Sequence, residues 1–574
     1  MKSRFLKLYL TVVLFWLFVT AVDVQSVELL QITNSDGEVT FSWPLVASNF
    51  VLQTTTGLDT SNGWTDLVLP TNVIGNRINA SLALTNPQQL FRLRVPAASP
   101  AIPIFSLAIF YNLDLEINPG AGMAVNGRVH SNQNIWATGN GSGVSSLNFL
   151  GLVDAVGTII TTRSPLDPYY SPVTNSHVNF KNFAVQYAAP LSPVPAAVGY
   201  SVSSNLLAIL NPPPAAYAPP NYVAAYSGQG TNYLENLVDL IISNPASGLA
   251  ATKGTNLIVY YQNPNNAPGY LTPVLPDVAV SSNVVSSVPP VTNVVYAGYS
   301  FVTNVSFFDY REISTVQAVQ INVRALNTWL TNRIALGSGN FTVNYIFPVL
   351  GVTNQSCTLG GQPYNQLNIL GSTAKGHSIN SIYVYNGVPP VAYTRLPAVR
   401  LMNGQQLPPD GLTVITPQPA YIEGNYNTTT NGQTFSMSLG DTTNTYPAAL
   451  MADAVTVLSA NWLDSYSITT PLPSRNSVST VINTATLQGI VPSNGANYSG
   501  GVENFLRLLE NWSGPLTLTY NGSIAVMFPS QYATNFWQNT GVYYNAPNRN
   551  WGFDNNFTNA AKLPPLTPEF FSGY

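Results

Sequence analysis

Short apolar runs separated by turn residues dominate the stretch from Leu407 to Trp462. The runs lie at Leu412–Ile415, Tyr421–Ile422 and Ala452–Leu458, between Pro-Gln-Pro, Gly-Asn and an Asn/Thr-rich loop. Each run is too short to be stable alone. Recurrence after a turn is what stacked rungs of a β-solenoid need, because each rung buries its apolar side against the next. We predict a solenoid-like region here, with a β-sandwich of short strands as the alternative.

Composition favours a mainly β protein with a neutral polar surface. Hydrophobic residues make up 45% of the 574 residues, but charged residues make up only 8%, against roughly 25% in typical soluble domains. The 41 Gly and 44 Pro suit many short strands joined by turns. A net charge of -4 provides no basic patch, so we expect no nucleic-acid partner.

The N-terminus has the pattern of a secretion signal. Three basic residues precede an uncharged apolar run from Leu8 to Val19, and Val19 and Ala21 are small residues at cleavage positions. We predict a signal peptide over residues 1–26 and expect contact with a membrane only through it. An uncleaved anchor is the alternative, although the run is shorter than the ~20 residues of a membrane span.

Cysteine usage bears on the compartment. The only cysteine, Cys357, has no partner for an intramolecular disulfide. A eukaryotic secretory route usually leaves more cysteines in so long a chain, so we predict a bacterial cell surface or exterior, with the periplasm as an alternative. We interpret Cys357 as a small buried apolar residue.

Residues 27–95 read as a separate all-β module. In VTFSW, Val39, Phe41 and Trp43 alternate onto one face, and Asn-Ser-Asp-Gly before them predicts a hairpin. Six or seven short strands in this length favour an immunoglobulin or fibronectin type III-like sandwich. The Pro/Ala-rich residues 96–103 read as a stiff linker.

Residues 104–564 are predicted to form a large β-solenoid-like domain, followed by an extended tail at 565–574. A Pro-rich and helix-bearing insertion is expected at about 165–400. Apolar spacing predicts amphipathic helices over Thr315–Asn332 and Val502–Trp512. Tyr-Asn-Gly-Ser between two strand-like runs predicts a hairpin over Leu516–Phe528.

Several long sequence segments in this region resemble segments of a family of large exported bacterial proteins, some described as type IV pilus assembly PilX-like. They include DLEINPG, NGRVHSN, FDYREISTVQAVQINV, GLTVITPQPAYIEGNYN and YSGGVENFLRLLENW. The resemblance covers about Ile104 to Pro564 and implies an exported, β-rich surface protein. It carries over no catalytic residues, and the long helix that follows the signal in pilins is absent from the sequence pattern.

The candidate metal ligands are sparse. His130, His177 and His377 are far apart in the sequence and belong to no compact ligand motif, so we predict no zinc site. Asp114 and Glu116 could share a calcium ion, but two carboxylates without a calcium-loop pattern favour a structural role. We predict no metal and no cofactor.

The main enzymatic alternative is a glycosidase or polysaccharide lyase, whose acid/base chemistry needs a pair of carboxylates about 5 to 10 Å apart. Five acidic residues lie near the predicted solenoid block: Asp410, Glu423, Asp441, Asp453 and Asp464. The sequence leaves open whether any two face each other. Asp453, in an apolar run, has the alternative of being hydrogen-bonded inside the protein.

Aromatic residues are the candidate sugar-stacking groups. The densest cluster is Tyr543, Tyr544, Trp551 and Phe553, although aromatic residues more often belong to a core. We therefore predict an exported structural or adhesive surface protein without catalysis, with other envelope proteins, a second copy or polysaccharide as partners. The alternative is a carbohydrate-binding or polysaccharide-degrading protein.

Overall fold

The computed structural model describes the following parts of the chain: residues 30–35, 38–44, 51–55, 64–67, 69–74, 77–83, 89–94, 101–140, 146–169, 176–180, 184–186, 206–218, 221–226, 228–244, 257–262, 271–274, 276–287, 290–296, 298–331, 340–346, 353–357, 377–430, 432–434, 442–538 and 541–571. The predicted signal segment and Asp441 lie outside these residues. The chain divides into two compact units, Met1–Ser99 with Tyr574, and Pro100–Gly573. The boundary falls inside the predicted linker.

The first unit contains two antiparallel sheets with a shared core. Its strands are β1 (Gln31–Ser35), β2 (Glu38–Pro44), β3 (Val51–Thr55), β4 (Thr65–Asp66), β5 (Thr71–Ile74), β6 (Arg77–Ala83) and β7 (Leu90–Arg94). One sheet has the order β1-β2-β6-β5 and the other β4-β3-β7. Val39, Phe41 and Trp43 are buried with Leu52 and Ile78, as the predicted alternation requires. The predicted β1–β2 hairpin is also present.

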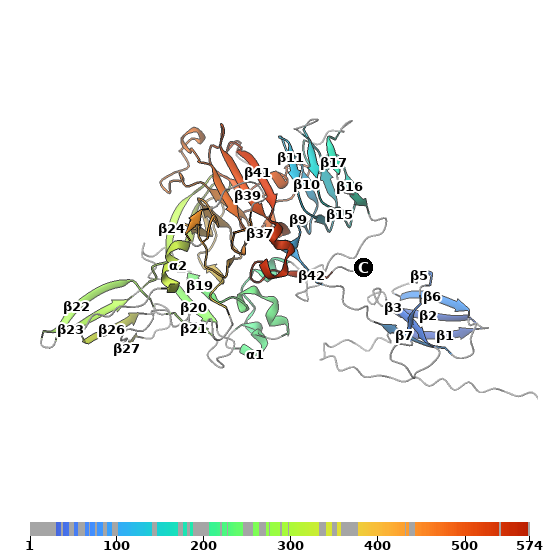
Figure 1. Ribbon diagram of the computed structural model, residues 1–574, viewed down its shortest axis with the longest axis horizontal. Coiled ribbons are helices and arrows are strands. Elements are labelled where there is room, and N and C mark those ends of the chain that lie inside the picture. The colour runs from blue at the N-terminus through green and yellow to red at the C-terminus, as the bar shows by residue number, and fades with distance from the viewer. Residues whose placement is uncertain are drawn as a thin grey trace, which may run out of the picture. The chain divides into compact units, whose positions relative to one another are not determined.

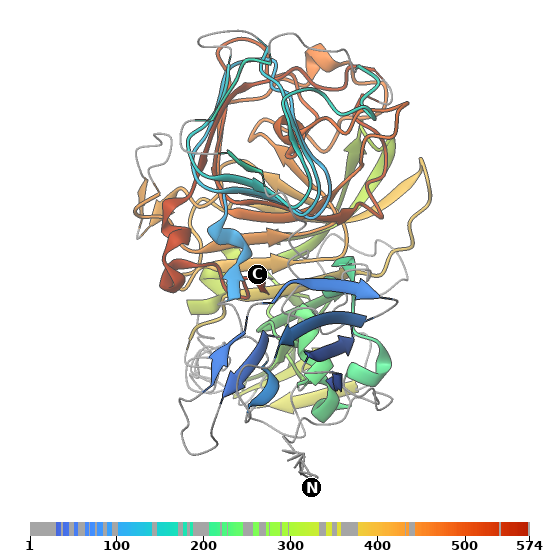
Figure 2. The ribbon, with the colours of Figure 1, turned by 90° about the vertical axis from the view of Figure 1, so that its right-hand side faces the viewer.

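The second unit begins with a coil of three short strands per turn (Figure 2). Successive turns contain β9 (Ile109–Tyr111), β10 (Leu115–Ile117) and β11 (Met123–Val125), then β12 (Val129–Ser131), β13 (Ile135–Ala137) and β14 (Leu147–Phe149), then β15 (Val153–Ala155), β16 (Ile159–Ile160) and β17 (Val178–Phe180), and finally β18 (Ala184–Gln186). Each strand pairs in parallel with the strand at the same position of the next turn. The buried residues therefore stack in columns, such as Ile109, Val129 and Val153.

A second set of parallel strands occupies the C-terminal half of the chain. These strands are β28 (Ser381–Asn386), β29 (Arg395–Met402), β30 (Leu412–Ile415), β31 (Ala420–Glu423), β34 (Ala448–Met451), β35 (Val455–Leu458), β36 (Thr480–Asn483), β37 (Ala485–Ile490), β38 (Arg507–Leu508), β39 (Thr517–Gly522), β40 (Ile524–Pro529) and β41 (Asn548–Phe553). They pair in the sheet orders β40-β37-β34-β30-β28, β29-β31-β35-β38 and β36-β39-β41.

Strands of both sets belong to one twelve-stranded sheet. The order of the strands in this sheet differs from their order in the sequence. The order is β18-β15-β12-β9-β40-β37-β34-β30-β28-β19-β20-β21, so β9, the first strand of the coil, lies beside β40. Near this junction β8 (Ala101–Pro103) pairs with β42 (Glu569–Phe571) (Figure 1). The predicted extended tail thus contains a strand, and the two ends of the unit lie together.

Most of the remaining elements lie between these two sets in the sequence. They are α1 (Tyr222–Ala225), β19 (Leu240–Asn244), β20 (Ile258–Gln262), β21 (Leu271–Pro273), β22 (Ala279–Ser287), β23 (Pro290–Tyr296), β24 (Val302–Asp309), β25 (Ser314–Asn322), α2 (Val323–Thr331), β26 (Asn340–Ile346) and β27 (Thr353–Cys357), with the short pair β32 (Thr429–Thr430) and β33 (Gln433–Thr434) further on. Strands β22, β23, β26 and β27 form their own sheet. Strands β28 and β29, which lie within the predicted insertion at about 165–400, pair with strands of the main sheets.

The predicted helix over Thr315–Asn332 is wrong in its first half. Residues Ser314–Asn322 form strand β25, and only Val323–Thr331 is helical. Strand β25 pairs with β24 on one side and β29 on the other. Hydrogen bonds to strands on both sides stabilise β25 as a strand. The apolar spacing alone was misleading, because a short buried strand can have the same spacing as a helix.

Two further local predictions fail for the same reason. The segment Val502–Trp512 forms a 3-10 turn at Val502–Asn504 and the short strand β38 instead of a helix. The runs in Leu516–Phe528 are strands, but β39 and β40 pair within different sheets instead of with each other. Asn521-Gly522 is a corner between sheets, and a Cβ on Gly522 would lie 2.0 Å from the carbonyl oxygen of Thr484.

The mainly β class is confirmed. The narrower assignment of the whole domain to a solenoid stays a prediction. Within the described residues, no helix has the length and apolar character needed to cross a membrane.

The corner of the coil between β14 and β15 leaves no room for a side chain at Gly151, whereas the corner at Gly120 is open, and this predicts a sharp contrast between the two glycines. A Cβ on Gly151 would lie 2.0 Å from the carbonyl oxygen of Gly127 in the preceding turn, whereas nothing lies within 4 Å of a Cβ on Gly120. We expect Gly151→Ala to lower the free energy of unfolding by about 3 kcal/mol, since the backbone must shift. Gly120→Ala is the control and should change it little. Equal stability of the two variants in urea unfolding would contradict the stacked corners.

Candidate functional site

Many of the chain's few charged residues are buried, and they are the first candidates for a site. The buried charged residues are Glu116, Asp154, Asp167, Asp239, Asp309, Arg311, Glu312, Arg400, Asp453, Arg475, Glu503, Arg507, Glu510 and Asp554. Burying a charge is costly unless it is paired or hydrogen-bonded. The contacts of each buried charge therefore indicate whether it is held by the fold or available for chemistry.

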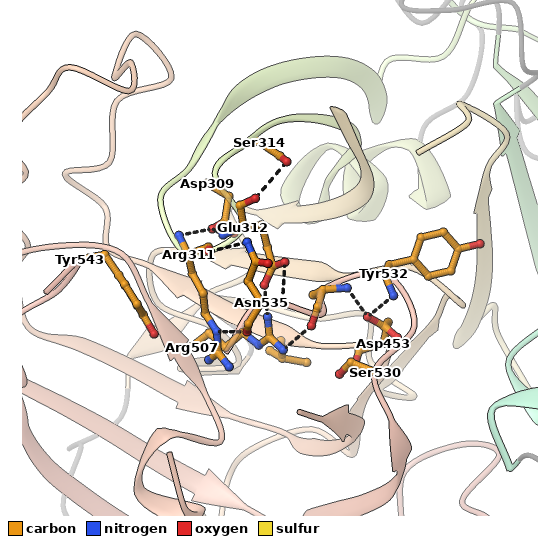
Figure 3. A network of polar contacts seen from close by, with 12 residues as sticks. Asp309, Arg311, Glu312, Ser314, Asp453, Arg507, Ser530, Tyr532, Asn535 and Tyr543 are labelled. Carbon is orange, nitrogen blue, oxygen red and sulfur yellow. Dashed lines mark hydrogen bonds and ion pairs between the residues drawn. The ribbon is translucent and has the colours of Figure 1, made fainter. Parts of the chain in front are cut away.

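Several of these buried charged residues lie in or near the turn between β24 and β25 (Figure 3). Asp309 Oδ1 accepts the backbone N–H groups of Arg311 and Glu312, both at 2.8 Å. Its other oxygen accepts the Tyr421 hydroxyl at 2.6 Å. The Arg311 Nε donates to the carbonyl oxygen of Asn535 at 3.2 Å. Asp309 therefore shapes its own turn and joins it to the neighbouring β31.

Glu312 and Arg507 form a buried ion pair across the same network. Arg507 Nη1 lies 2.7 Å from Glu312 Oε1, and Arg507 Nη2 donates to the carbonyl oxygen of Ala533 at 2.8 Å. The backbone N–H of Asn535 donates to the other Glu312 oxygen at 3.1 Å. Burial raises the pKa of Glu312 to about 7, against the opposing effect of Arg507. Both charges are thus used in joining segments far apart in sequence.

Asp453 is the acidic residue in the apolar run, and it is fully buried. Its carboxylate accepts three consecutive backbone N–H groups, from Gln531 at 2.5 Å, Tyr532 at 3.1 Å and Ala533 at 2.8 Å (Figure 3). Burial nonetheless raises the pKa of this carboxyl. The interpretation of Asp453 as hydrogen-bonded inside the protein fits these contacts.

Two other candidate carboxylates meet at an arginine instead of across a cleft. Arg400 Nη1 lies 3.1 Å from Glu423 Oε2 and 2.5 Å from Asp464 Oδ1, and Arg400 Nη2 donates to Asp464 Oδ2 at 2.8 Å. The guanidinium also lies over the ring of Phe307, 4.9 Å from its centroid. The structure therefore brings this pair together as partners of a buried cation.

Asp410 lies at a large cleft beside the twelve-stranded sheet. The cleft has a volume of about 700 Å³, within the range of small-molecule sites. Asp239, Asn380, Asp410 and Pro447 line it, and they immediately precede or lie close to the amino ends of strands β19, β28, β30 and β34. The register of the sheet thus gathers residues that are far apart in the sequence.

Two carboxylates hold the segment between His377 and Ser381 on the wall of this cleft. Asp239 Oδ2 accepts the Asn380 N–H at 2.9 Å and the Ser381 hydroxyl at 3.1 Å. Asp410 Oδ2 accepts the backbone N–H of Ser378 at 2.9 Å and also its hydroxyl. The Ser378 hydrogen bonds lower the pKa of Asp410. Asp239 is buried and Asp410 is exposed.

The three histidines lie in separate surroundings. His130 lies between Asp154, 2.5 Å from its Nδ1, and Asn132, 2.9 Å from its Nε2. His177 precedes β17 with a positive φ of 50°, and His377 lines the cleft. In the described part of the chain, no three His, Cys, Asp or Glu side chains gather as a metal site.

Asp114 and Glu116 have separate partners, although both line one small cavity with Arg311 and Arg507. Asp114 accepts the N–H and the side-chain amide of Asn134, at 2.9 and 3.0 Å, and the Trp136 indole at 3.1 Å. Glu116 accepts the hydroxyls of Ser493 and Ser499, and burial raises its pKa. These contacts favour the structural interpretation of the pair over calcium binding.

The C-terminal aromatic cluster is mostly core. Tyr543, Trp551 and Phe553 are buried, and Tyr544 is half-buried. Tyr520 packs edge-on against Trp551, with ring centroids 5.8 Å apart. The cluster therefore offers no exposed row of rings for stacking on a sugar.

Sequence reasoning missed Asp239 and Asn380, the cleft residues that precede β19 and β28. Both lie directly before short apolar runs, LIISN and SIYVYN, which is the only signal that could have marked them. Pairing of β19 with β28 brings together residues more than a hundred positions apart.

Comparison with known proteins found no match. No family model, curated protein or solved structure is similar to this chain at a significant level. The resemblance to exported bacterial surface proteins therefore stays a prediction.

The ion pair in Figure 3 predicts a pH-dependent loss of stability. We expect Arg507→Met to lower the free energy of unfolding by roughly 3–5 kcal/mol at pH 8, because it leaves Glu312 buried without its cation. The loss should be smaller at pH 5, where Glu312 can take up a proton. Arg507→Met with Glu312→Gln should recover part of it, and the exposed Arg324→Met is the control. An equal loss at both pH values would contradict the pairing.

Glu503 is one of the buried glutamates that make the stability of the second unit depend on pH. Burial raises its pKa to about 7 from the usual value of about 4.5, so its contribution to stability is complete below pH 4.5 and disappears as the pH rises through 7. We expect thermal stability to fall between pH 5 and pH 8. Glu503→Gln should remove up to about 3 kcal/mol of that fall.

The exposed Glu569→Gln is the matched control and should keep the wild-type pH slope. Calorimetry at several pH values measures both. A protein that is more stable at pH 8, or a Glu503→Gln variant with the wild-type slope, would contradict this assignment.

Proposed function

We infer that this chain is an exported structural or adhesive protein of a bacterial cell surface and that it performs no catalysis. One observation carries the non-catalytic part. Each described member of the predicted acid/base set is already bound by the protein itself: Asp410, Glu423, Asp453 and Asp464. A glycosidase needs one carboxyl group to give a proton and a second to act as a base or nucleophile, and groups bound in this way are poorly suited to either role.

The export part is supported by the N-terminal sequence and by the distribution of charge. Three basic residues followed by an apolar run are typical of a signal peptide. Buried charges and a single cysteine suit a protein whose stability comes from internal packing and hydrogen bonds. A surface of neutral polar residues favours contacts through hydrogen bonds and apolar patches over electrostatic attraction.

A second candidate function is carbohydrate binding, and one observation favours it. The cleft beside β19, β28 and β30 has the size of a ligand site, and its lining combines neutral polar side chains with two carboxylates and apolar groups. Binding there is compatible with an adhesive protein.

Export is testable with the full chain in a bacterial host. We expect the wild-type protein to leave the cytoplasm and Leu14→Arg to remain inside, because a charge in the apolar run opposes recognition as a signal. Leu14→Ile is the matched control and should be exported. Cell fractionation and mass spectrometry of the N-terminus measure the result.

Equal export of Leu14→Arg would contradict the signal-peptide assignment. The non-catalytic part has its own contrary outcome. Release of reducing ends from polysaccharide by the purified chain, lost in Glu423→Gln, would favour the glycosidase alternative.

A further inference from the structure

The cleft beside the amino ends of β19, β28 and β30 holds polar groups that make no hydrogen bond to another described residue. The Asn380 side-chain amide is half-buried and makes no hydrogen bond to another described residue, although its backbone N–H is held by Asp239. It therefore presents one donor group and one acceptor to the cleft. A fixed backbone with an unused amide is the arrangement that a ligand contact requires.

Two neighbouring groups add acceptors. Both hydrogen bonds from Ser378 to the Asp410 carboxylate go to Oδ2, and its Oδ1 receives no hydrogen bond from the described residues. His377 Nδ1 lies 2.7 Å from the carbonyl oxygen of Ser378. Because a carbonyl only accepts, Nδ1 carries the proton, and Nε2 is an acceptor when the ring is neutral.

The rest of the lining combines an aromatic ring with apolar groups. The Tyr226 hydroxyl donates to Gln262 Oε1 at 2.7 Å, which fixes the position of the ring. Leu563, Pro565 and Leu566 approach from the C-terminal segment. A wall of this kind suits the apolar face of a ring whose edge carries hydroxyl groups.

The charges of the residues that line the cleft indicate which class of ligand it can bind. Among the described residues that line the cleft there is no Lys or Arg, and the two carboxylates are those of Asp239 and Asp410. These carboxylates would repel an acidic ligand. Asp239 is buried, and its Oδ2 is held by the 377–381 segment, so Asp410 is the exposed carboxylate among the described lining residues. One carboxylate oxygen beside neutral donors and acceptors fits a pair of hydroxyl groups.

We propose that this cleft binds a neutral, hydroxyl-rich ring, the chemistry of an uncharged saccharide unit, through Asn380, Asp410 and His377 against the ring of Tyr226. The proposal deepens the proposed adhesive function and rests on it for the setting in which the ligand is met. The ligand is held without any bond being made or broken.

Calorimetric titration of the purified full chain tests the proposal with defined probes. The neutral probes are trisaccharides of glucose, mannose and N-acetylglucosamine, and the charged comparators are trigalacturonic acid and the trimer of glucosamine. We expect at least one neutral probe to bind and both charged probes to bind more weakly. Asn380→Ala should weaken binding about tenfold, as the loss of hydrogen bonds to one side chain implies.

Two further variants control this experiment. Asn461→Ala removes an exposed amide that does not line the cleft, and it should bind as the wild type does. Ala561→Trp adds a large ring to an exposed lining position and should abolish binding without loss of thermal stability. Ala561→Trp also keeps the test decisive if Asn380→Ala proves unstable.

Absence of binding by all neutral probes at millimolar concentration would overturn the proposal. So would tighter binding of either charged probe, or neutral binding that both Asn380→Ala and Ala561→Trp leave unchanged. Failure here concerns the ligand class only. Failure of export in the Leu14 experiment would instead contradict the proposed cellular role.

Discussion

The parallel pairing of β9 with β40 is the contact on which the second unit depends. It joins Ile109, Phe110 and Tyr111 to Ile524, Ala525 and Val526, and through them the first coil to the C-terminal strands. Without it the twelve-stranded sheet would be two separate sheets with open edges, each exposing unpaired backbone groups. The pairing of β8 with β42 has a similar effect, because it joins the start of the unit to its end.

This topology differs from a simple stack of repeats because strands far apart in the sequence are neighbours in the sheet. In a simple stack each repeat contacts only its sequence neighbours. Here β40, near the C-terminal end of the unit, pairs with β9, the first strand of the coil. The Asn126 side chain, which accepts the Phe553 N–H at 2.9 Å, adds a contact between the first coil and the C-terminal strands. Thr413 in β30 donates to the carbonyl oxygen of Pro565 at 2.7 Å and so holds the C-terminal segment against the sheet. The ends of the unit therefore stabilise its middle.

Buried charges supply a second kind of long-range contact. Asp453 holds the backbone of 531–533, Asp239 holds that of 380–381, and Glu510 accepts the N–H of Ser459 at 2.6 Å. A carboxylate that accepts backbone N–H groups fixes a turn where no regular hydrogen-bond ladder exists. A chain with one cysteine thus uses its rare charges to fasten irregular segments, and its surface is left with mostly neutral groups.

The sequence predicted those features that depend on local pattern. Alternation at Val39, Phe41 and Trp43 was sufficient for the core of the first unit, and the frequency of turn residues was sufficient for the mainly β class. Periodicity failed at Thr315–Asn332 and Val502–Trp512, because strand pairing with distant segments decided the structure.

The candidate site was less predictable for a related reason. Asp410 and His377 were recognised as candidates, but their meeting with Asp239 and Asn380 in one cleft depends on the pairing of β19, β28 and β30. The sequence left open which of the candidate carboxylates meet. In the structure Glu423 and Asp464 meet at Arg400, whose position no local pattern indicates. Pairing across long sequence separations determined both outcomes.

Native-state hydrogen exchange of the full chain tests the junction most directly. If β9 and β40 are neighbouring strands of one sheet, the amides of Ile109–Tyr111 should be protected to the same degree as those of Ile524–Val526, and both should exchange only when the second unit unfolds as a whole. Exchange of the 109–111 amides through a separate, earlier opening would show that the first coil is an independent unit, which would contradict the account.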